Sequence, residues 1–171
     1  MTKRAPTIAA AAAAFLFCAG CKPRVKEITS LQRREAGGLV SEAKFALSVR
    51  DVARAETTLA RAVALCPDIG DTWLELGRCR MKLGNRSGAK EAYLSALAAY
   101  KDDAARDPAI RAPSLIRQIY VLALLGRVDE ARAVLAKARK ELPDHADLRG
   151  FDQGRQIDQM LASPVFKEVA L

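Results

Sequence analysis

Residues 70–103 read GDTWLELGRCRMKLGNRSGAKEAYLSALAAYKDD, and this stretch decides the fold. Small and bulky residues recur in it at helical spacing, in the two blocks Trp73-x2-Leu76-Gly77 and Ala89-x3-Tyr93-x2-Ala96. Small side chains let two helices approach closely, and rings fill the space that remains. Gly84, between the two blocks, can take the left-handed conformation that ends a helix. The stretch therefore predicts two antiparallel helices joined by a tight turn.

The second block recurs along the chain. It is found 34 residues earlier as Ala55-x3-Leu59-x2-Ala62 and 42 residues later as Ala131-x3-Leu135-x2-Ala138. A fixed period of this size indicates a stack of repeats, because one hairpin cannot bury its own apolar face. We predict three units, at residues 36–69, 70–103 and 112–145. The residues inserted between the last two units are expected to lengthen the second helix of the middle unit.

The unit resembles the tetratricopeptide repeat, whose pattern is W-x2-L-G-x2-Y…A-x3-F…P. The middle unit matches most closely, although Arg80 stands where the pattern has tyrosine. The third unit has Gln118-Ile119 in place of the Leu-Gly pair. The resemblance covers about residues 36–145 and implies an all-α solenoid of about three helical hairpins. It assigns the repeat core to Trp73, Leu76, Gly77, Ala89, Tyr93, Ala96, Ala131 and Ala138.

Residues 146–162 are predicted to form a capping helix after the last unit. Terminal repeats of a stack need such a cap because no further hairpin covers them. Its apolar side chains at helical spacing are Leu148, Phe151, Ile157 and Leu161. Residues 163–171 follow the cap as a tail.

The first twenty residues have the three parts of a secretory signal. Lys3 and Arg4 precede an apolar run at residues 8–17, and small residues follow at 18–20. The run is too short to cross a bilayer as a lasting helix, which needs about 20 residues. We therefore predict that residues 1–20 are an export signal.

Cys21 follows Ala19-Gly20 and resembles the cysteine that becomes the lipid-modified N-terminus of bacterial lipoproteins. Cys18 departs from that pattern, in which leucine is usual, so cleavage before Cys21 by the ordinary signal peptidase is the alternative. The residue after Cys21 is Lys22 rather than aspartate, and in this the sequence resembles lipoproteins that are sent on to the outer membrane. The resemblance implies an exported protein, lipid-anchored at Cys21 in the outer membrane and facing the periplasm.

The formal net charge is +8, and it is unevenly distributed. Residues 21–35 are predicted to be a basic tether. Its residues 21–34 carry five basic side chains and one acidic one, whereas residues 35–171 have a net charge of only +2. Basic side chains beside a lipid anchor are attracted to anionic lipid. Binding to nucleic acid would require the basic face on the folded part, so that class is excluded.

No set of residues predicts catalysis, a metal site or a cofactor. His145 is the only histidine, which makes His-containing metal sites and Ser-His-Asp catalysis poor hypotheses. Gly84 to Lys90 lacks the G-x4-G-K-[ST] spacing of a phosphate-binding loop. Cys66 and Cys79 are expected to be too far apart for a disulfide, given their positions on consecutive antiparallel helices.

The family's binding surface is commonly the groove lined by the first helices of the hairpins. With Trp73, Leu76 and Gly77 packed inward, the opposite face of each first helix gives an apolar and basic stripe. This predicted groove consists of Val40, Lys44, Leu47, Leu74, Arg78, Met81, Ile116 and Tyr120. The alternative is that its apolar members simply pack between neighbouring helices.

The predicted groove would suit a peptide with an acidic residue between two apolar ones. The tail, SPVFKEVAL at residues 163–171, has that composition, so it could occupy the groove of its own or of a neighbouring chain. Val40 and Glu75 stand where the family's carboxylate-clamping members need polar or basic groups, so that function does not carry over.

The leading hypothesis is a lipid-anchored scaffold for protein–protein interactions in the bacterial cell envelope. The alternative is a structural lipoprotein subunit of a pilus or an outer-membrane barrel-assembly machine, which would use its outer faces rather than the groove. In both cases the partner is a protein, and no enzyme activity is expected.

Overall fold

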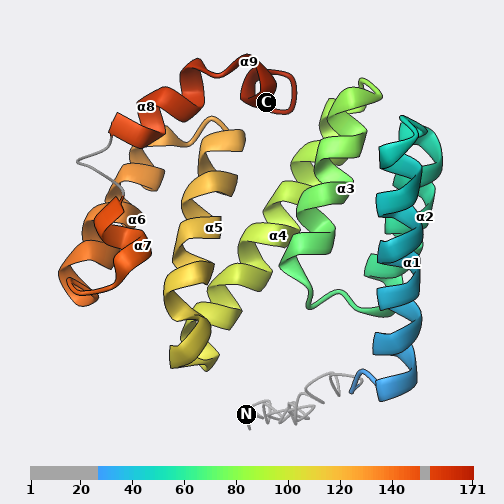
Figure 1. Cartoon of the computed structure of the whole chain (residues 1–171), viewed down its shortest axis with the longest axis horizontal. Coiled ribbons are helices and arrows are strands. Elements are labelled where there is room, and N and C mark those ends of the chain that lie inside the picture. Colours follow the sequence, from blue (N-terminus) through green and yellow to red (C-terminus); the bar gives the residue numbers. More distant parts are fainter. Residues whose placement is uncertain (1–26, 151–154) are drawn as a thin grey trace, which may run out of the picture.

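The computed structural model describes residues 27–150 and 155–171 (Figure 1). Within these ranges the chain contains helices and no strand. The predicted signal at 1–20, Cys21 and Phe151 lie outside the described residues. Three helical hairpins follow one another, which confirms the predicted all-α stack: α1 (Ser30–Ser48) with α2 (Val52–Leu65), α3 (Gly70–Lys82) with α4 (Arg86–Arg106), and α5 (Arg111–Leu124) with α6 (Val128–Glu141).

Each hairpin turns through a residue in the left-handed conformation. Gly84 has φ 77° and Gly126 has φ 71°, as expected for glycine at the end of a helix. The first hairpin places Arg50 at the same point, with φ 63°. A side chain there costs roughly 1–2 kcal/mol, because its Cβ crowds the following carbonyl. The second helix then begins on a cap; Asp51 and Asn85 each accept a backbone N–H three residues later.

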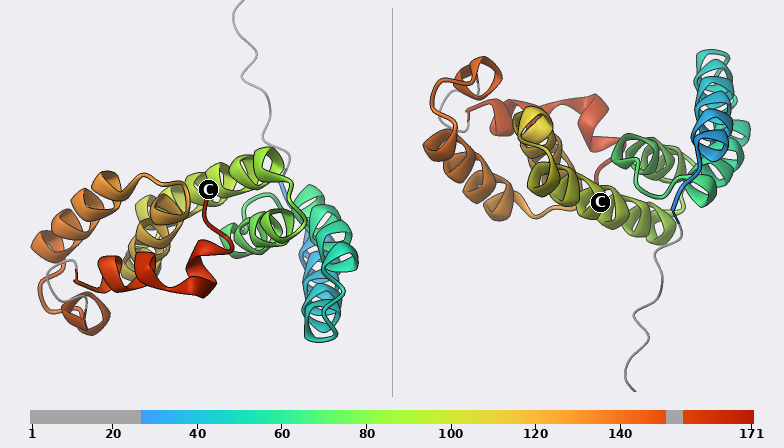
Figure 2. Two further views of the ribbon diagram at one scale, coloured as in Figure 1. Left: turned by 90° about the horizontal axis from the view of Figure 1, so that it is seen from above. Right: turned by 90° about the horizontal axis from the view of Figure 1, so that it is seen from below.

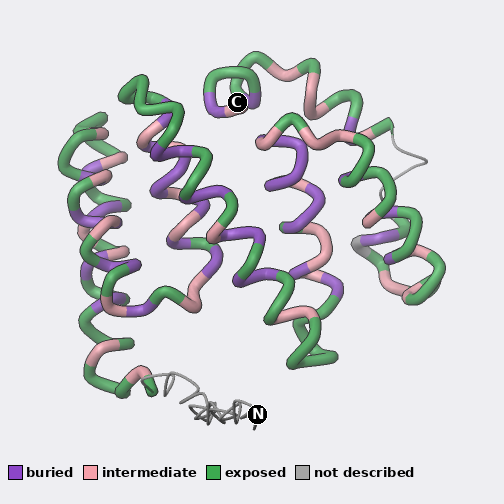
Figure 3. Tube along the Cα trace, turned by 180° about the vertical axis from the view of Figure 1, so that it is seen from behind, coloured by how far each residue is buried: buried purple, intermediate pink, exposed green. Residues whose placement is uncertain are grey.

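The middle hairpin closes around the ring of Tyr93, which is completely buried. Gly77 lies directly against this ring, and a Cβ added there would overlap it. Of the predicted repeat core, all residues but Trp73 are buried (Figure 3). Trp73 is partly buried, and its indole N–H donates to the carbonyl of Pro67 at 2.8 Å. The close approach that the small residues predict is therefore present.

Two departures from the repeat pattern have polar partners. Arg80, in place of tyrosine, pairs with Glu56 of α2 at 2.9 Å and donates to the carbonyl of Gly88 at 3.1 Å. Gln118, in place of leucine, is buried and donates from its side-chain amide to the carbonyl of Tyr100 at 3.0 Å. Both side chains thus bridge neighbouring helices, a role that the apolar residues of the pattern fill by packing.

The insertion lengthens α4 to 21 residues, whereas α2 and α6 have 14. The short 3-10 helix η1 (Pro108–Ile110) follows, and Asp107 accepts the N–H of Ala109 at 2.8 Å. This matches the expected lengthening of the second helix in the middle unit.

The predicted tether at 21–35 extends too far. Helix α1 begins at Ser30, because Thr29 and Gln32 form a reciprocal capping box. Arg33, which was assigned to the tether, therefore lies in the first turns of α1 and pairs with Asp68 at 2.7 Å.

The predicted capping helix at 146–162 is also corrected, because the structure describes two helices in this range, α7 (Ala146–Gly150) and α8 (Arg155–Ala162). Leu148 packs with Ala112 and Ala138, whereas Ile157 joins the central cluster around Tyr93. The two helices thus cover different parts of the stack. Residues 163–171 continue into α9 (Pro164–Lys167). Within 27–150 and 155–171, none of the helices has both the length and the apolar character to span a bilayer.

Candidate peptide-binding face

A cavity of about 540 Å³ opens between α1 and α3, and we call it the open cavity. Three predicted groove residues line it from α1: Val40, Lys44 and Leu47. Leu59 and Ile69 complete the apolar wall, and Asp71, Thr72 and Glu75 of α3 face them. The first helices of the first two hairpins therefore enclose a depression that is apolar on one side and polar on the other.

The acidic side chains of the open cavity already have cationic partners. Asp71 accepts from the guanidinium of Arg117 at 2.8 Å and from the hydroxyl of Tyr100 at 2.5 Å. Glu75 pairs with Arg78 at 2.9 Å. Burial and the hydrogen bond to Asp71 raise the pKa of the Tyr100 hydroxyl, which therefore stays protonated and donates.

Lys44 differs from these side chains. It is exposed at the rim of the open cavity, and among the described residues it makes no ion pair. Arg33, the other cation of the cavity, is bound to Asp68. The open cavity thus combines an apolar wall with one uncompensated positive charge.

We call the side of the stack lined by the first helices α1, α3 and α5 the concave face. The open cavity lies in its α1–α3 half, and the tail, residues 163–171 of the same chain, lies in the other half (Figure 2). Phe166 is buried, and its ring meets that of Tyr120 edge-on, with centroids 5.7 Å apart. The hydroxyl of Tyr93 donates to the carbonyl of Val169 at 2.6 Å. The backbone N–H of Leu171 donates to the carbonyl of Leu124 at 2.9 Å. The tail therefore occupies the groove of its own chain, over α3, α4 and α5.

The predicted groove is not a continuous open surface. Leu74 and Met81 are each only 9% exposed and belong to the central cluster that includes Phe166 and Val169, so the alternative interpretation, packing between neighbours, applies to them. Ile116 packs beside Ala112 and Leu148. The physical reason is that α3 packs against α2 on one side and α4 on the other, so apolar side chains outside the predicted inward stripe are also buried.

Arg78 and Tyr120, the remaining members of the predicted groove, lie at the boundary between the two halves. Arg78 donates to the hydroxyl of Tyr120 at 3.2 Å, and its guanidinium lies 5.8 Å from the centre of that ring. A second cavity, of about 190 Å³, separates the tail from α3, and we call it the tail cavity. Leu47 and Glu75 line both cavities, so the two adjoin.

Sequence reasoning missed several residues of this face. Arg33 was placed in the tether, although Thr29 and Gln32 have the spacing of a capping box and signal a helix start. The buried anchors Phe166 and Val169 stand three residues apart, a helical spacing that would have marked one side of the tail as apolar. No local signal pointed to the hydroxyl of Tyr93.

Residues 71–103, the stretch that forms α3 and most of α4, match the sequence model of a family described as Tetratricopeptide repeat. This stretch is similar to a tetratricopeptide repeat. The stacked hairpins on either side make the described chain a helical-hairpin solenoid of the same kind. Tetratricopeptide repeats serve in protein–protein interactions and bind protein or peptide partners. A search of curated proteins found no match to the chain.

Proposed function

We propose that this tetratricopeptide-repeat protein is a scaffold that binds a segment of a partner protein in the open cavity. The observation that carries the proposal is the pairing of the apolar wall of Val40 and Leu47 with the uncompensated charge of Lys44. Ligand sites are concave and mostly apolar, with a few polar groups that fix orientation, and one common mode of peptide recognition likewise uses a hydrophobic groove. The open cavity has these properties, and it lies on the face that the family commonly uses.

The fitting partner segment has apolar side chains and one carboxylate. Its apolar side chains would cover Val40 and Leu47, while the carboxylate would meet Lys44. An exposed charge pair contributes only about 0.2–1 kcal/mol, so the apolar contacts dominate affinity and the charge sets the register. Binding should therefore depend weakly on salt.

Paired variants in a pull-down from detergent-solubilised envelopes test this proposal. Val40→Ser with Leu47→Ser should remove the bound partner, whereas Lys44→Glu should only weaken its recovery. Lys90→Glu, which changes an exposed lysine on α4, is the matched control. Recovery of the same partners by all four proteins would end the proposal.

We further propose that the scaffold is exported and lipid-anchored at Cys21 in the outer membrane, facing the periplasm. The support is the sequence alone: the signal at residues 1–20, the small residues before Cys21 and the basic residues after it. Metabolic labelling with a clickable fatty acid should mark the wild type and not Cys21→Ala. Equal labelling of both would contradict the anchor.

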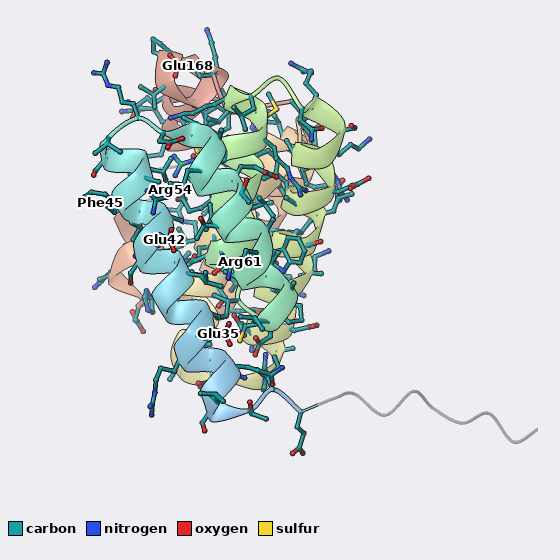
Figure 4. The ribbon with its side chains drawn as sticks, turned by 90° about the vertical axis from the view of Figure 1, so that its right-hand side faces the viewer. Glu35, Glu42, Phe45, Arg54, Arg61 and Glu168 are labelled. Atoms are coloured by element: carbon teal, nitrogen blue, oxygen red, sulfur yellow. The ribbon has the colours of Figure 1, made fainter. Side chains whose placement is uncertain are left out.

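One observation favours the alternative of a structural subunit that works through its outer faces, in a pilus or a barrel-assembly machine. Phe45 of α1 and Val49, the residue that caps the C-terminal end of α1, are 62% and 59% exposed, and Figure 4 shows Phe45 pointing away from α2. An apolar pair on the terminal helix of a stack favours a contact there. If partners are lost in Phe45→Ser with Val49→Ser but kept in the cavity variants, this alternative replaces the scaffold.

A further inference from the structure

The tail is attached to the concave face through few contacts. Its buried side chains are those of Phe166 and Val169, whereas Val165 is 66% exposed and Lys167 and Glu168 are exposed. Two hydrogen bonds, from Tyr93 to the carbonyl of Val169 and from the N–H of Leu171 to the carbonyl of Leu124, fix its backbone. Ala170 and Leu171 are half-buried and pack against the central cluster. Apolar anchors and backbone hydrogen bonds, with the charged side chains facing solvent, are also how a bound peptide is held.

The tail fits this seat incompletely. The tail cavity of about 190 Å³ remains between it and the neighbouring helices. Arg78 and Lys82 line the cavity on one side, and Glu168 lines it on the other. Glu75 also lines this cavity and pairs with Arg78, so among the described residues Lys82 is the cation of the seat that makes no ion pair. The seat thus offers this cation near the acidic residue of its occupant, with room for a larger side chain.

We propose that the seat of the tail is a second peptide site, which takes a partner segment of the pattern aromatic-x-acidic-aliphatic. The tail, with Phe166, Glu168 and Val169 in that pattern, is its resident ligand and controls access to it. This second site extends the proposed function to the other half of the same face. It rests on the proposed function for the premise that this face binds peptides. Because Leu47 and Glu75 line both cavities, displacing the tail would join the open cavity to the seat.

Two buried cysteines allow a direct test in the full-length chain. Cys79 is 1% exposed and lines the tail cavity, so release of the tail should uncover it. Cys66 is also buried, but it caps the C-terminal end of α2 and does not line the tail cavity. Both thiols are free. Alkylation read at each cysteine by mass spectrometry therefore separates tail release from unfolding.

The experiment compares the wild type with Phe166→Ala, which removes an anchor, and Lys167→Ala, a matched change at an exposed position of the same segment. Phe166→Ala should accelerate alkylation of Cys79 about tenfold or more and leave Cys66 slow, as expected for local opening. Lys167→Ala should behave as the wild type. A synthetic peptide of residues 163–171, added in excess, should restore protection of Cys79 in Phe166→Ala, and the same peptide with alanine for phenylalanine should not.

Three results would overturn the proposal. Cys79 could stay protected in Phe166→Ala, the peptide could fail to restore protection, or Cys66 and Cys79 could accelerate together because the tail belongs to the cooperative core. Hydrogen exchange of the wild type decides the case if the variant does not fold. The amides of the tail must exchange faster than those of α4, and equal rates would contradict the proposal.

The result of the alkylation assay does not depend on whether a partner binds in the open cavity. The alkylation assay uses no cellular partner, so it can succeed although the Val40 and Leu47 variants keep their partners, and it can fail although those variants lose them. The second peptide site and the proposed function can therefore be rejected separately.

Discussion

The hydroxyl oxygen of Tyr93 lies 2.6 Å from the carbonyl oxygen of Val169, 76 residues further along the chain. This bond connects the core of the middle repeat to the tail. Tyr93 fills the hairpin against Gly77 with its ring and binds the tail with its hydroxyl. One side chain thus serves both the repeat fold and the occupation of its concave face.

Tyr93→Phe should therefore destabilise the protein although the ring is kept. The carbonyl of Val169 loses its partner at a buried position, and leaving such a group unsatisfied costs about 1–3 kcal/mol. Denaturant unfolding would measure this difference. The control is Tyr120→Phe, which removes a half-buried hydroxyl and should cost less than about 1 kcal/mol. Equal effects of the two substitutions would contradict the special role of the Tyr93 hydroxyl.

Gly77→Ala should be strongly destabilising, because the new Cβ would overlap the buried ring of Tyr93. Overpacking of this kind costs about 1–3 kcal/mol or more. Gly37 is the matched control, since it is also a helical glycine but a Cβ there would meet no atom within 4 Å. Gly37→Ala should raise stability by roughly 1 kcal/mol through helix propensity. Thermal melts that shift in the same direction for both variants would mean that the hairpin packing is described wrongly.

Arg50→Gly should stabilise the first hairpin. Arg50 holds φ 63°, where Gly84 and Gly126 stand in the other two hairpins. Removing its Cβ relieves a strain of roughly 1–2 kcal/mol, against a smaller loss from the greater freedom of glycine in the unfolded chain. The net gain should be of the order of 1 kcal/mol by denaturant unfolding. The reverse change, Gly84→Ala, should lower stability, and a gain there would refute the argument.

Stability should fall as the pH rises above about 9. Burial raises the pKa of the Cys79 thiol to about 11, so this thiol stays protonated in the folded state while the unfolded chain loses its proton. Between these two pKa values the unfolded state binds fewer protons, and the free energy of unfolding falls by up to about 1.4 kcal/mol per pH unit. Denaturant unfolding between pH 8 and pH 11 would measure this slope. Cys79→Ala should reduce it, and an unchanged slope would contradict the assignment.

The sequence predicted the hairpins because their signals are local. The spacing of Gly77, Ala89 and Ala96 marks a close helix crossing, and the glycines at 84 and 126 mark turns. The turn at Arg50 carried no such glycine, although the recurring period still located the first hairpin. The start of α1 was placed too late because the charges of Arg33 and Arg34 were assigned to the tether, although the capping box at Thr29 was present.

The candidate site was less predictable because it depends on contacts between distant segments. Helical phase predicts Val40, Lys44 and Leu47 on one side of α1, and these three residues line the open cavity. The same phase placed Leu74 and Met81 on an open face, but whether a face is open depends on what covers it. Both residues are buried in the central cluster, which also contains Phe166 and Val169, and the periodicity within α3 does not show which distant segments join that cluster.

The most direct test of the central claim, that a partner binds in the open cavity, is site-specific photo-crosslinking in cells. A photoreactive amino acid replaces Lys44, at the rim of the cavity, or Lys90, an equally exposed lysine on α4. We expect an adduct with a partner protein from position 44 and none from position 90. Adducts from position 90, with none from position 44, would contradict it.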